Sequence, residues 1–81
     1  MPITFEQLKA TGRLQHLPGT RRGCWHIVPT LEVVAQKDGP GFFESGDTCI
    51  ADSVDENGKY PNTIHLTCGY WWNLRVFELK N

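Results

Sequence analysis

Residues 62–79 read NTIHLTCGYWWNLRVFEL and contain the clearest strand pattern of the chain. Ile64, Leu66 and Cys68 alternate with polar residues, so the apolar side chains would point to one face of an extended strand and the polar ones to the other. Alternation of this kind is typical of a strand that packs one face on a core. The stretch therefore indicates a β fold.

The end of this stretch, RVFEL at residues 75–79, predicts another strand. Phe77 and Leu79 would lie on one face of it, and Val76 and Glu78 on the other.

Three aromatic residues, Tyr70, Trp71 and Trp72, stand side by side between these two strands. Successive side chains of a strand alternate between its faces, so the three cannot all point inward. We predict that one tryptophan packs in the core or on a helix, and that the other joins Tyr70 in a binding surface of the kind found at interface hot spots. Phe42 and Phe43, from a Gly-rich segment, are candidates for the same surface.

Upstream segments extend the β pattern. CWHIV at 24–28 and TLEVVAQ at 30–36 are rich in β-branched and aromatic residues, and Pro29 between them predicts a bend or an edge. Turn residues fill 37–47, after which TCIADSV at 48–54 resumes the strand pattern. We therefore predict four or five short strands.

A short helix is predicted at the N-terminus. Thr4 and Gln7 have the spacing of a capping box, Phe5 and Leu8 have helical spacing, and Gly12 can end the turn.

The segment that follows, residues 12–23, gathers glycine and proline and is predicted to be an irregular loop that carries Arg21 and Arg22. Residues 1–23 hold four cations and one carboxylate, whereas the rest of the chain holds four cations and eight carboxylates. Such an uneven distribution of charge can steer the approach of a charged partner, although in most small proteins it only keeps two faces of the molecule solvated.

The length of 81 residues allows one core, because a chain this short buries only about 60 % of its unfolded surface. We predict a single domain over 1–81, with the helix and basic loop in 1–23 and the β unit in 24–81. The predicted fold class is mainly β with one short N-terminal helix (α+β). Short strands at this spacing favour a small antiparallel sheet that curls or closes into a barrel, because curling protects the sheet edges.

Two segments carry a resemblance to known proteins. FFESGDTCIADSV at 42–54 resembles the Phe, Gly-Asp, strand pattern of Src-homology-3-like small barrels, and WWNLRVFEL at 71–79 is similar to the Trp, Arg, Phe, Glu ending of short barrel proteins common in bacteriophages and prophages. The resemblance covers the second half of the chain and leaves out the helix and the basic loop. It implies a small phage-type or prophage-type barrel with an interaction role, which would bind a host protein and modulate or inhibit it.

Histidine and cysteine residues raise the question of a metal site. Cys24-x-His26 and His65-x-x-Cys68 have spacings that suit tetrahedral zinc, so a small zinc-stabilised module is one alternative. In a strand, however, His65 and Cys68 point opposite ways unless the chain turns after Cys68. We therefore expect no metal and no cofactor. The odd number of cysteines, three, argues against a disulfide framework.

The same residues are candidates for a nucleophile and its base. Cys68 with His65, or Cys24 with His26, lacks a nucleophile elbow and an oxyanion-hole signature, and no carboxylate pair stands out as acid and base. We expect a non-enzymatic protein without catalytic residues.

A nucleotide or nucleic-acid binder is the alternative function. Arg21 and Arg22 would contact phosphate while Trp25 or Trp72 stacks on a base. The net charge of −1 favours a small ligand over a nucleic acid, which normally requires an excess of cations. The predicted binding residues for all functions together are Arg21, Arg22, Trp25, Phe42, Phe43, Tyr70, Trp71 and Trp72.

The expected partner is a host protein, with a nucleotide or nucleic acid and a second copy of the chain as open alternatives. Apolar runs such as 27–35 are interrupted and too short to span a membrane, and the N-terminus lacks a signal pattern. We expect a cytoplasmic protein that contacts no membrane, in the host cytoplasm if the chain is phage-encoded.

Overall fold

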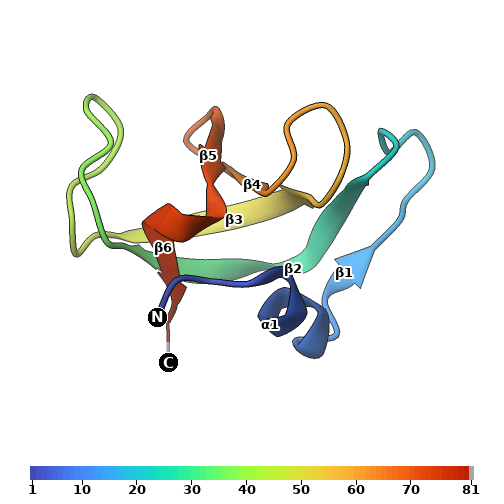
Figure 1. Cartoon of the computed structure of the whole chain (residues 1–81), viewed down its shortest axis with the longest axis horizontal. Helices are drawn as coiled ribbons and strands as arrows, with labels where there is room; N and C mark the ends of the chain where they lie inside the picture. Colours follow the sequence, from blue (N-terminus) through green and yellow to red (C-terminus); the bar gives the residue numbers. More distant parts are fainter. Residues whose placement is uncertain (81) are drawn as a thin grey trace.

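The structure is a computed structural model that describes residues 1–80. It contains one α-helix, six strands and a 3-10 helix, η1 (Figure 1). In chain order these are α1 (Phe5–Ala10), β1 (Leu14–Gln15), β2 (Cys24–Ala35), β3 (Thr48–Asp55), β4 (Thr63–Leu66), β5 (Trp71–Asn73), η1 (Leu74–Val76) and β6 (Phe77–Leu79).

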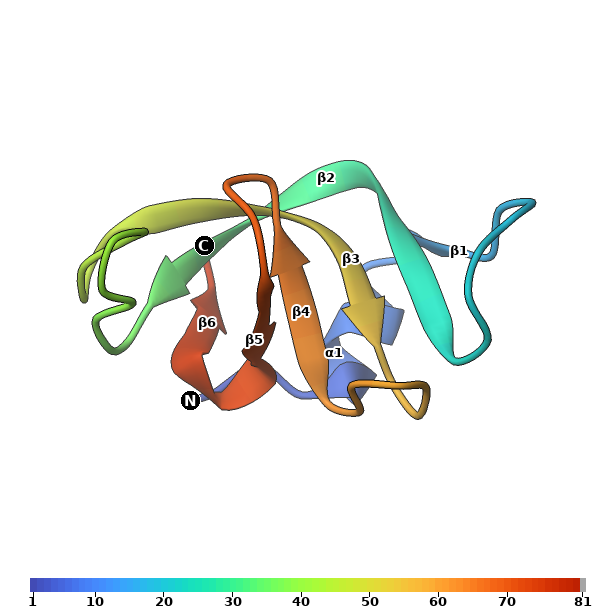
Figure 2. The ribbon, with the colours of Figure 1, turned by 90° about the horizontal axis from the view of Figure 1, so that it is seen from above.

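All strands belong to one antiparallel sheet in the order β1-β2-β3-β4-β5, and β6 also pairs with β2 (Figure 2). Within the described residues β5 pairs only with β4, so the sheet curls but does not close into a barrel. This confirms the predicted mainly β fold with one short N-terminal helix, in the form of a small curled antiparallel sheet.

β2 is the longest strand and joins the two segments predicted on either side of Pro29. Its register against β3 shifts between His26, which faces Ser53, and Leu31, which faces Ala51. The predicted irregularity at Pro29 is therefore confirmed, and β2 bends there (Figure 2). The bend lets one strand pair with β1 near its start and with β6 near its end.

Two predictions about local structure are wrong. The loop predicted over 12–23 contains β1, in which Leu14 pairs with Ile27 because its side chain packs on the core. The strand predicted over 75–79 begins only at Phe77. The Asn73 side chain accepts a hydrogen bond of 2.9 Å from the Arg75 N–H, and this cap starts η1 in place of a strand.

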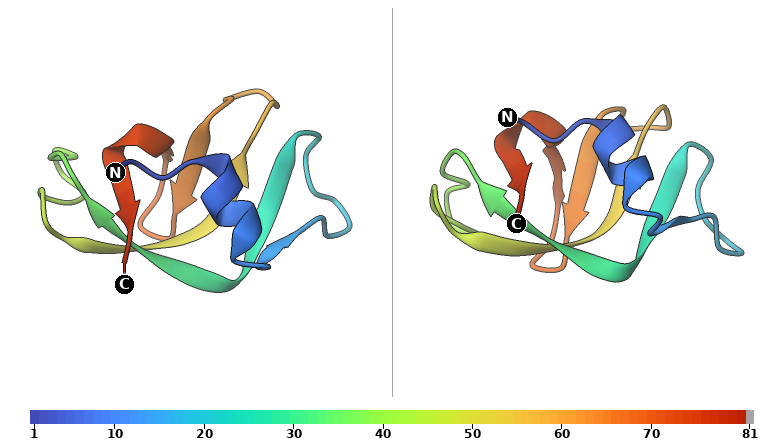
Figure 3. Two further views of the ribbon diagram at one scale, coloured as in Figure 1. Left: turned by 60° about the horizontal axis from the view of Figure 1, so that its bottom comes forward. Right: turned by 90° about the horizontal axis from the view of Figure 1, so that it is seen from below.

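The N-terminal segment covers one side of the curled sheet (Figure 3). Ile3 and Leu8 belong to the core, and the Ile3 N–H donates to the Phe77 carbonyl at 2.9 Å. The predicted capping box is present: the Gln7 N–H donates to the Thr4 hydroxyl at 3.2 Å, and the Thr4 N–H donates to Gln7 Oε1 at 3.0 Å. The helix is therefore anchored at its first turn and through Leu8.

The core lies between the curled sheet and α1. Its buried residues are Ile3, Leu8, Ile27, Val33, Ala35, Phe43, Cys49, Ala51, Val54, Ile64, Leu66, Leu74 and Phe77. The opposite face of the sheet, here called the outer face, carries a row in which His26, Ser53, His65 and Trp71 pair across four neighbouring strands.

Candidate functional site

Trp71 and Trp72 lie on opposite faces of β5, as alternation along a strand requires. Trp72 pairs with Ile64 and packs against the core, whereas Trp71 pairs with His65 on the outer face. Both are half-buried, and the preceding Tyr70 is 67 % exposed. The three adjacent aromatic residues therefore serve two different surfaces.

The first surface joins the loop of residues 36–47 to the turn between β4 and β5. The Phe42 ring contacts the Tyr70 and Trp72 rings edge-on, at centroid distances of 4.9 and 5.5 Å. Phe43 lies beneath, with its centroid 4.8 Å from that of Trp72. We call Phe42, Tyr70 and Trp72 the aromatic surface. Its exposed part consists of Phe42, at 41 % exposure, and Tyr70.

A tight turn from Gly39 to Phe43 places the adjacent Phe42 and Phe43 side chains in different environments. The Phe43 N–H donates to the Gly39 carbonyl at 3.0 Å, and the Gly39 N–H donates to the Phe43 carbonyl at 2.9 Å. A Cβ on Gly39 would collide with the Phe43 ring, so only glycine allows this close approach. Phe43 is thereby buried against the core, and Phe42 is left at the surface.

The turn that carries Tyr70 contains a strained residue. Tyr70 has φ 63°, in the left-handed region, where non-glycine residues are uncommon and bulky side chains are unfavourable. Hydrogen bonds hold the turn on both sides: the Gly69 N–H donates to the Leu66 carbonyl at 3.0 Å, and Trp72 Nε1 donates to the Gly69 carbonyl at 3.2 Å. The Tyr70 ring therefore lies over Phe42 at a cost in backbone energy.

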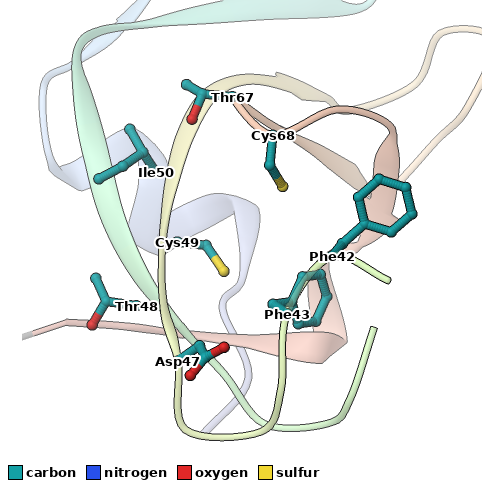
Figure 4. Close-up of a pocket in the computed structure, with 8 residues that line it drawn as sticks. All are labelled: Phe42, Phe43, Asp47, Thr48, Cys49, Ile50, Thr67 and Cys68. Carbon is teal, nitrogen blue, oxygen red and sulfur yellow. The ribbon is translucent and has the colours of Figure 1, made fainter. Parts of the chain in front are cut away.

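A pocket of about 310 Å³ lies beside the aromatic surface (Figure 4). Phe42, Phe43, Asp47, Thr48, Cys49, Ile50, Thr67 and Cys68 line it. Burial raises the pKa of the Cys49 thiol above its ordinary value, and the nearby Cys68 and Asp47 act in the same direction.

The second surface is built around Arg21. The carbon of its guanidinium lies 5.4 Å from the Tyr60 ring centroid and 5.3 Å from that of Trp71, within the range of cation–π attraction. Its Nη2 lies 3.6 Å from Asp55 Oδ2. Two aromatic rings and one carboxylate thus hold the guanidinium at the edge of the outer face.

Asp55 is fully buried and holds together the loop that brings Tyr60 to Arg21. Its carboxylate accepts hydrogen bonds from the N–H groups of Gly58 and Tyr60. A side chain on Gly58 would collide with the Arg22 carbonyl and with the Asp55 carboxylate. The two loops that flank Asp55 are therefore packed backbone to backbone.

Arg21 borders a pocket of about 250 Å³, which we call the Arg21 pocket. Gly19, Thr20, Arg21, Cys24, Trp25, His26, Ser53 and Trp71 line it. The buried Thr20 Oγ1 has no hydrogen-bond partner among residues 1–80. A guanidinium, hydroxyls and an imidazole beside indole rings make a pocket chemically suited to a small anionic aromatic molecule.

The predicted binding residues divide between the two surfaces. Arg21, Trp25 and Trp71 line the Arg21 pocket, whereas Phe42, Phe43, Tyr70 and Trp72 belong to the aromatic surface or lie beneath it. Arg22 is exposed and does not line the Arg21 pocket.

The second surface also contains residues that no sequence pattern placed there, namely Thr20, His26, Ser53, Asp55 and Tyr60. Only the pairing of β2 with β3 and of β3 with β4 brings His26 beside Ser53 and Ser53 beside His65, and no local sequence motif predicts that register. Asp55, at the end of β3 and directly before the turn, is a weak signal, since a carboxylate at this position can accept backbone N–H groups.

The four candidate metal ligands are separated. Cys24 and His26 line the Arg21 pocket, Cys68 lines the pocket beside the aromatic surface, and His65 Nδ1 lies 2.8 Å from Asp52 Oδ1. Among the described residues no three histidine, cysteine or acidic side chains gather in a way that could hold a metal ion. β4 ends at Leu66 and Cys68 lies in the turn that follows, so alternation along a strand, from which we expected His65 and Cys68 to diverge, does not extend to Cys68.

Within residues 1–80, no helix has both the length and the apolar character needed to cross a membrane. In comparisons with known proteins, no family model, curated protein or solved structure matches this chain.

Proposed function

We propose that this chain is a non-enzymatic interaction protein that binds another protein through the aromatic surface. The observation that carries the proposal is Tyr70, whose ring is two-thirds exposed although its backbone occupies the left-handed region. A left-handed conformation costs a non-glycine residue roughly 1–2 kcal/mol, and an exposed ring regains little of this by packing. Strain that stability does not explain is typical of binding sites.

The support beneath the surface also favours binding. Trp72 and Phe43 pack under Phe42 and are themselves held by the core, so the exposed rings need little ordering when a partner arrives. Preorganised aromatic side chains of this kind supply most of the energy at protein interfaces.

The acidic side chains Asp38, Glu44 and Asp47 lie in the same loop as Phe42. A partner with an apolar centre and a basic rim would complement this arrangement. The resemblance of the chain to small phage and prophage proteins supports a host protein as that partner, which the chain would modulate or inhibit.

Replacing Tyr70 with Asn tests this proposal. Asn tolerates the left-handed region better than Tyr, so we expect Tyr70→Asn to be as stable as the wild type or up to about 1 kcal/mol more stable in thermal denaturation. The same variant should retain less of the partner in affinity capture. A loss of more than about 1 kcal/mol would show that Tyr70 serves the fold, and unchanged capture would contradict the proposed function.

A second candidate function uses the Arg21 pocket, where Arg21 and two tryptophans lie together. We propose as the alternative that this pocket binds a phosphate-bearing nucleotide, with the phosphate on Arg21 and the base on an indole ring. The Arg21 side chain is 44 % exposed, so its guanidinium is accessible to a phosphate.

Titration with nucleoside mono- and triphosphates checks this candidate. We expect the nucleotides to quench tryptophan fluorescence, and the quenching to weaken as salt is added. The apparent affinity should be at least about tenfold lower in Arg21→Lys, because an ammonium group cannot reproduce the planar fork of the guanidinium. Arg22→Ala is the matched control and should bind as the wild type does. The absence of quenching at low salt, or equal losses in both variants, would exclude this ligand class.

A further inference from the structure

Cys49 in β3 and Cys68 in the turn after β4 belong to neighbouring segments. Ala51 pairs with Leu66, where β4 ends, and the Thr67 N–H donates to the Ile50 carbonyl at 2.9 Å. Cys49 precedes Ile50 and Cys68 follows Thr67, so this hydrogen bond holds the two cysteines near each other. A disulfide spans Cα atoms that are about 4.4–6.8 Å apart.

The two thiols also share one cavity. Figure 4 shows the sulfur atoms of Cys49 and Cys68 pointing into the pocket beside Phe42 and Phe43. Both cysteines are free thiols in the structure, with Cys49 buried and Cys68 exposed. The influence of Cys68 on the pKa of Cys49 agrees with this proximity. Cys24 lies elsewhere, in the Arg21 pocket.

We propose that Cys49 and Cys68 form a dithiol redox site, which a small disulfide oxidant such as glutathione disulfide converts into an intramolecular disulfide. The exposed Cys68 is the thiol that an oxidant reaches first. The buried Cys49 lies beside it and completes the bond, so the two have different roles.

The reaction balances in two exchange steps. The Cys68 thiolate attacks glutathione disulfide, which forms a mixed disulfide and releases one glutathione thiolate. Cys49 then loses its proton and attacks the Cys68 sulfur, which forms the protein disulfide and releases the second glutathione. Two protein thiols are oxidised, and one glutathione disulfide is reduced to two glutathione molecules.

The bond would tie the turn of residues 67–70 to β3. Tyr70 belongs to this turn, and its ring contacts the ring of Phe42, which lines the pocket. Oxidation would therefore fix the position of the turn that carries Tyr70 in the aromatic surface. The thiol chemistry itself does not depend on whether that surface binds a protein.

Peptide mapping of the dilute native protein after equilibration with glutathione disulfide tests the site. Tryptic cleavage after Arg22, Lys37, Lys59 and Arg75 places Cys24 in peptide 23–37, Cys49 in peptide 38–59 and Cys68 in peptide 60–75. We expect a disulfide that joins 38–59 to 60–75. The oxidised protein should melt higher than the reduced protein by on the order of 10 °C, because the bond closes a loop of about 20 residues.

Three variants separate the roles of the thiols. Cys24→Ala should form the same disulfide as the wild type. Cys49→Ala should retain glutathione on Cys68 as a stable mixed disulfide, and Cys68→Ser should form neither product. Linkage of Cys24 to either partner, disulfide dimers through Cys68, or a wild type that stops at the mixed disulfide would overturn the proposal.

Discussion

Asp55→Ala should lower the free energy of unfolding by about 2–5 kcal/mol, because two backbone N–H groups lose their acceptor, at about 1–3 kcal/mol each, whereas the ion pair with the partly exposed Arg21 adds little. Asp55 has no exposed surface, and its carboxylate accepts the N–H groups of Gly58 and Tyr60 beside the guanidinium of Arg21. The substitution leaves two N–H groups without their acceptor and a cation without its partner. Urea denaturation followed by tryptophan fluorescence measures the loss.

Two further variants show whether the geometry of Asp55 causes this effect. Asp55→Asn keeps one carbonyl oxygen and should lose less than Asp55→Ala. Asp52→Ala removes a half-exposed carboxylate that pairs with His65 and should cost no more than about 1 kcal/mol. An Asp55→Ala variant as stable as Asp52→Ala would refute the view that Asp55 organises the loops around Arg21.

The elements that sequence analysis predicted correctly have local causes. The capping box of Thr4 and Gln7 lies within four residues, and the alternation around Ile64 and Leu66 lies within one strand. Signals of this kind are visible in the sequence because the interacting residues are neighbours along the chain.

The elements that sequence analysis missed depend on distant partners. β1 has only two residues and forms because β2 supplies its hydrogen-bonding partner. The contact of Arg21 with Trp71 joins residues 50 positions apart. It requires the full register from β2 to β5, which no stretch of sequence encodes by itself.

The candidate sites show the same division. Alternation along β5 predicted that Tyr70, Trp71 and Trp72 divide between two faces, and the structure places Trp72 on Phe42 and Trp71 over Arg21. Which tryptophan joins which surface follows from the pairing of β5 with β4. The register of that pairing is set by the turn between the two strands and is not readable from composition.

The double substitution Phe42→Ser and Tyr70→Ser should weaken partner binding by at least about 100-fold. Interface hot spots each contribute about 2 kcal/mol or more, and each 1.4 kcal/mol corresponds to about a factor of ten in affinity. Both rings are exposed, so the variant should keep its fold and most of its stability. Circular dichroism and thermal denaturation check the fold, and calorimetry with the captured partner measures the affinity.

Leu17→Ser with Val28→Ser is the matched control. These two side chains are 39 % and 41 % exposed and belong to neither the aromatic surface nor the pocket beside it. The control also removes two partly exposed apolar side chains, although a smaller area of them, so it separates a loss of specific binding from a loss of nonspecific hydrophobic adsorption.

The most direct test of the proposed interaction is quantitative affinity capture from bacterial lysates with the wild type, the aromatic-surface variant and this control. We predict that at least one protein is retained equally by the wild type and the control and is lost with Phe42→Ser and Tyr70→Ser. Equal retention of every captured protein by all three forms, or no retention by the folded wild type, would contradict the proposal that the aromatic surface binds a protein.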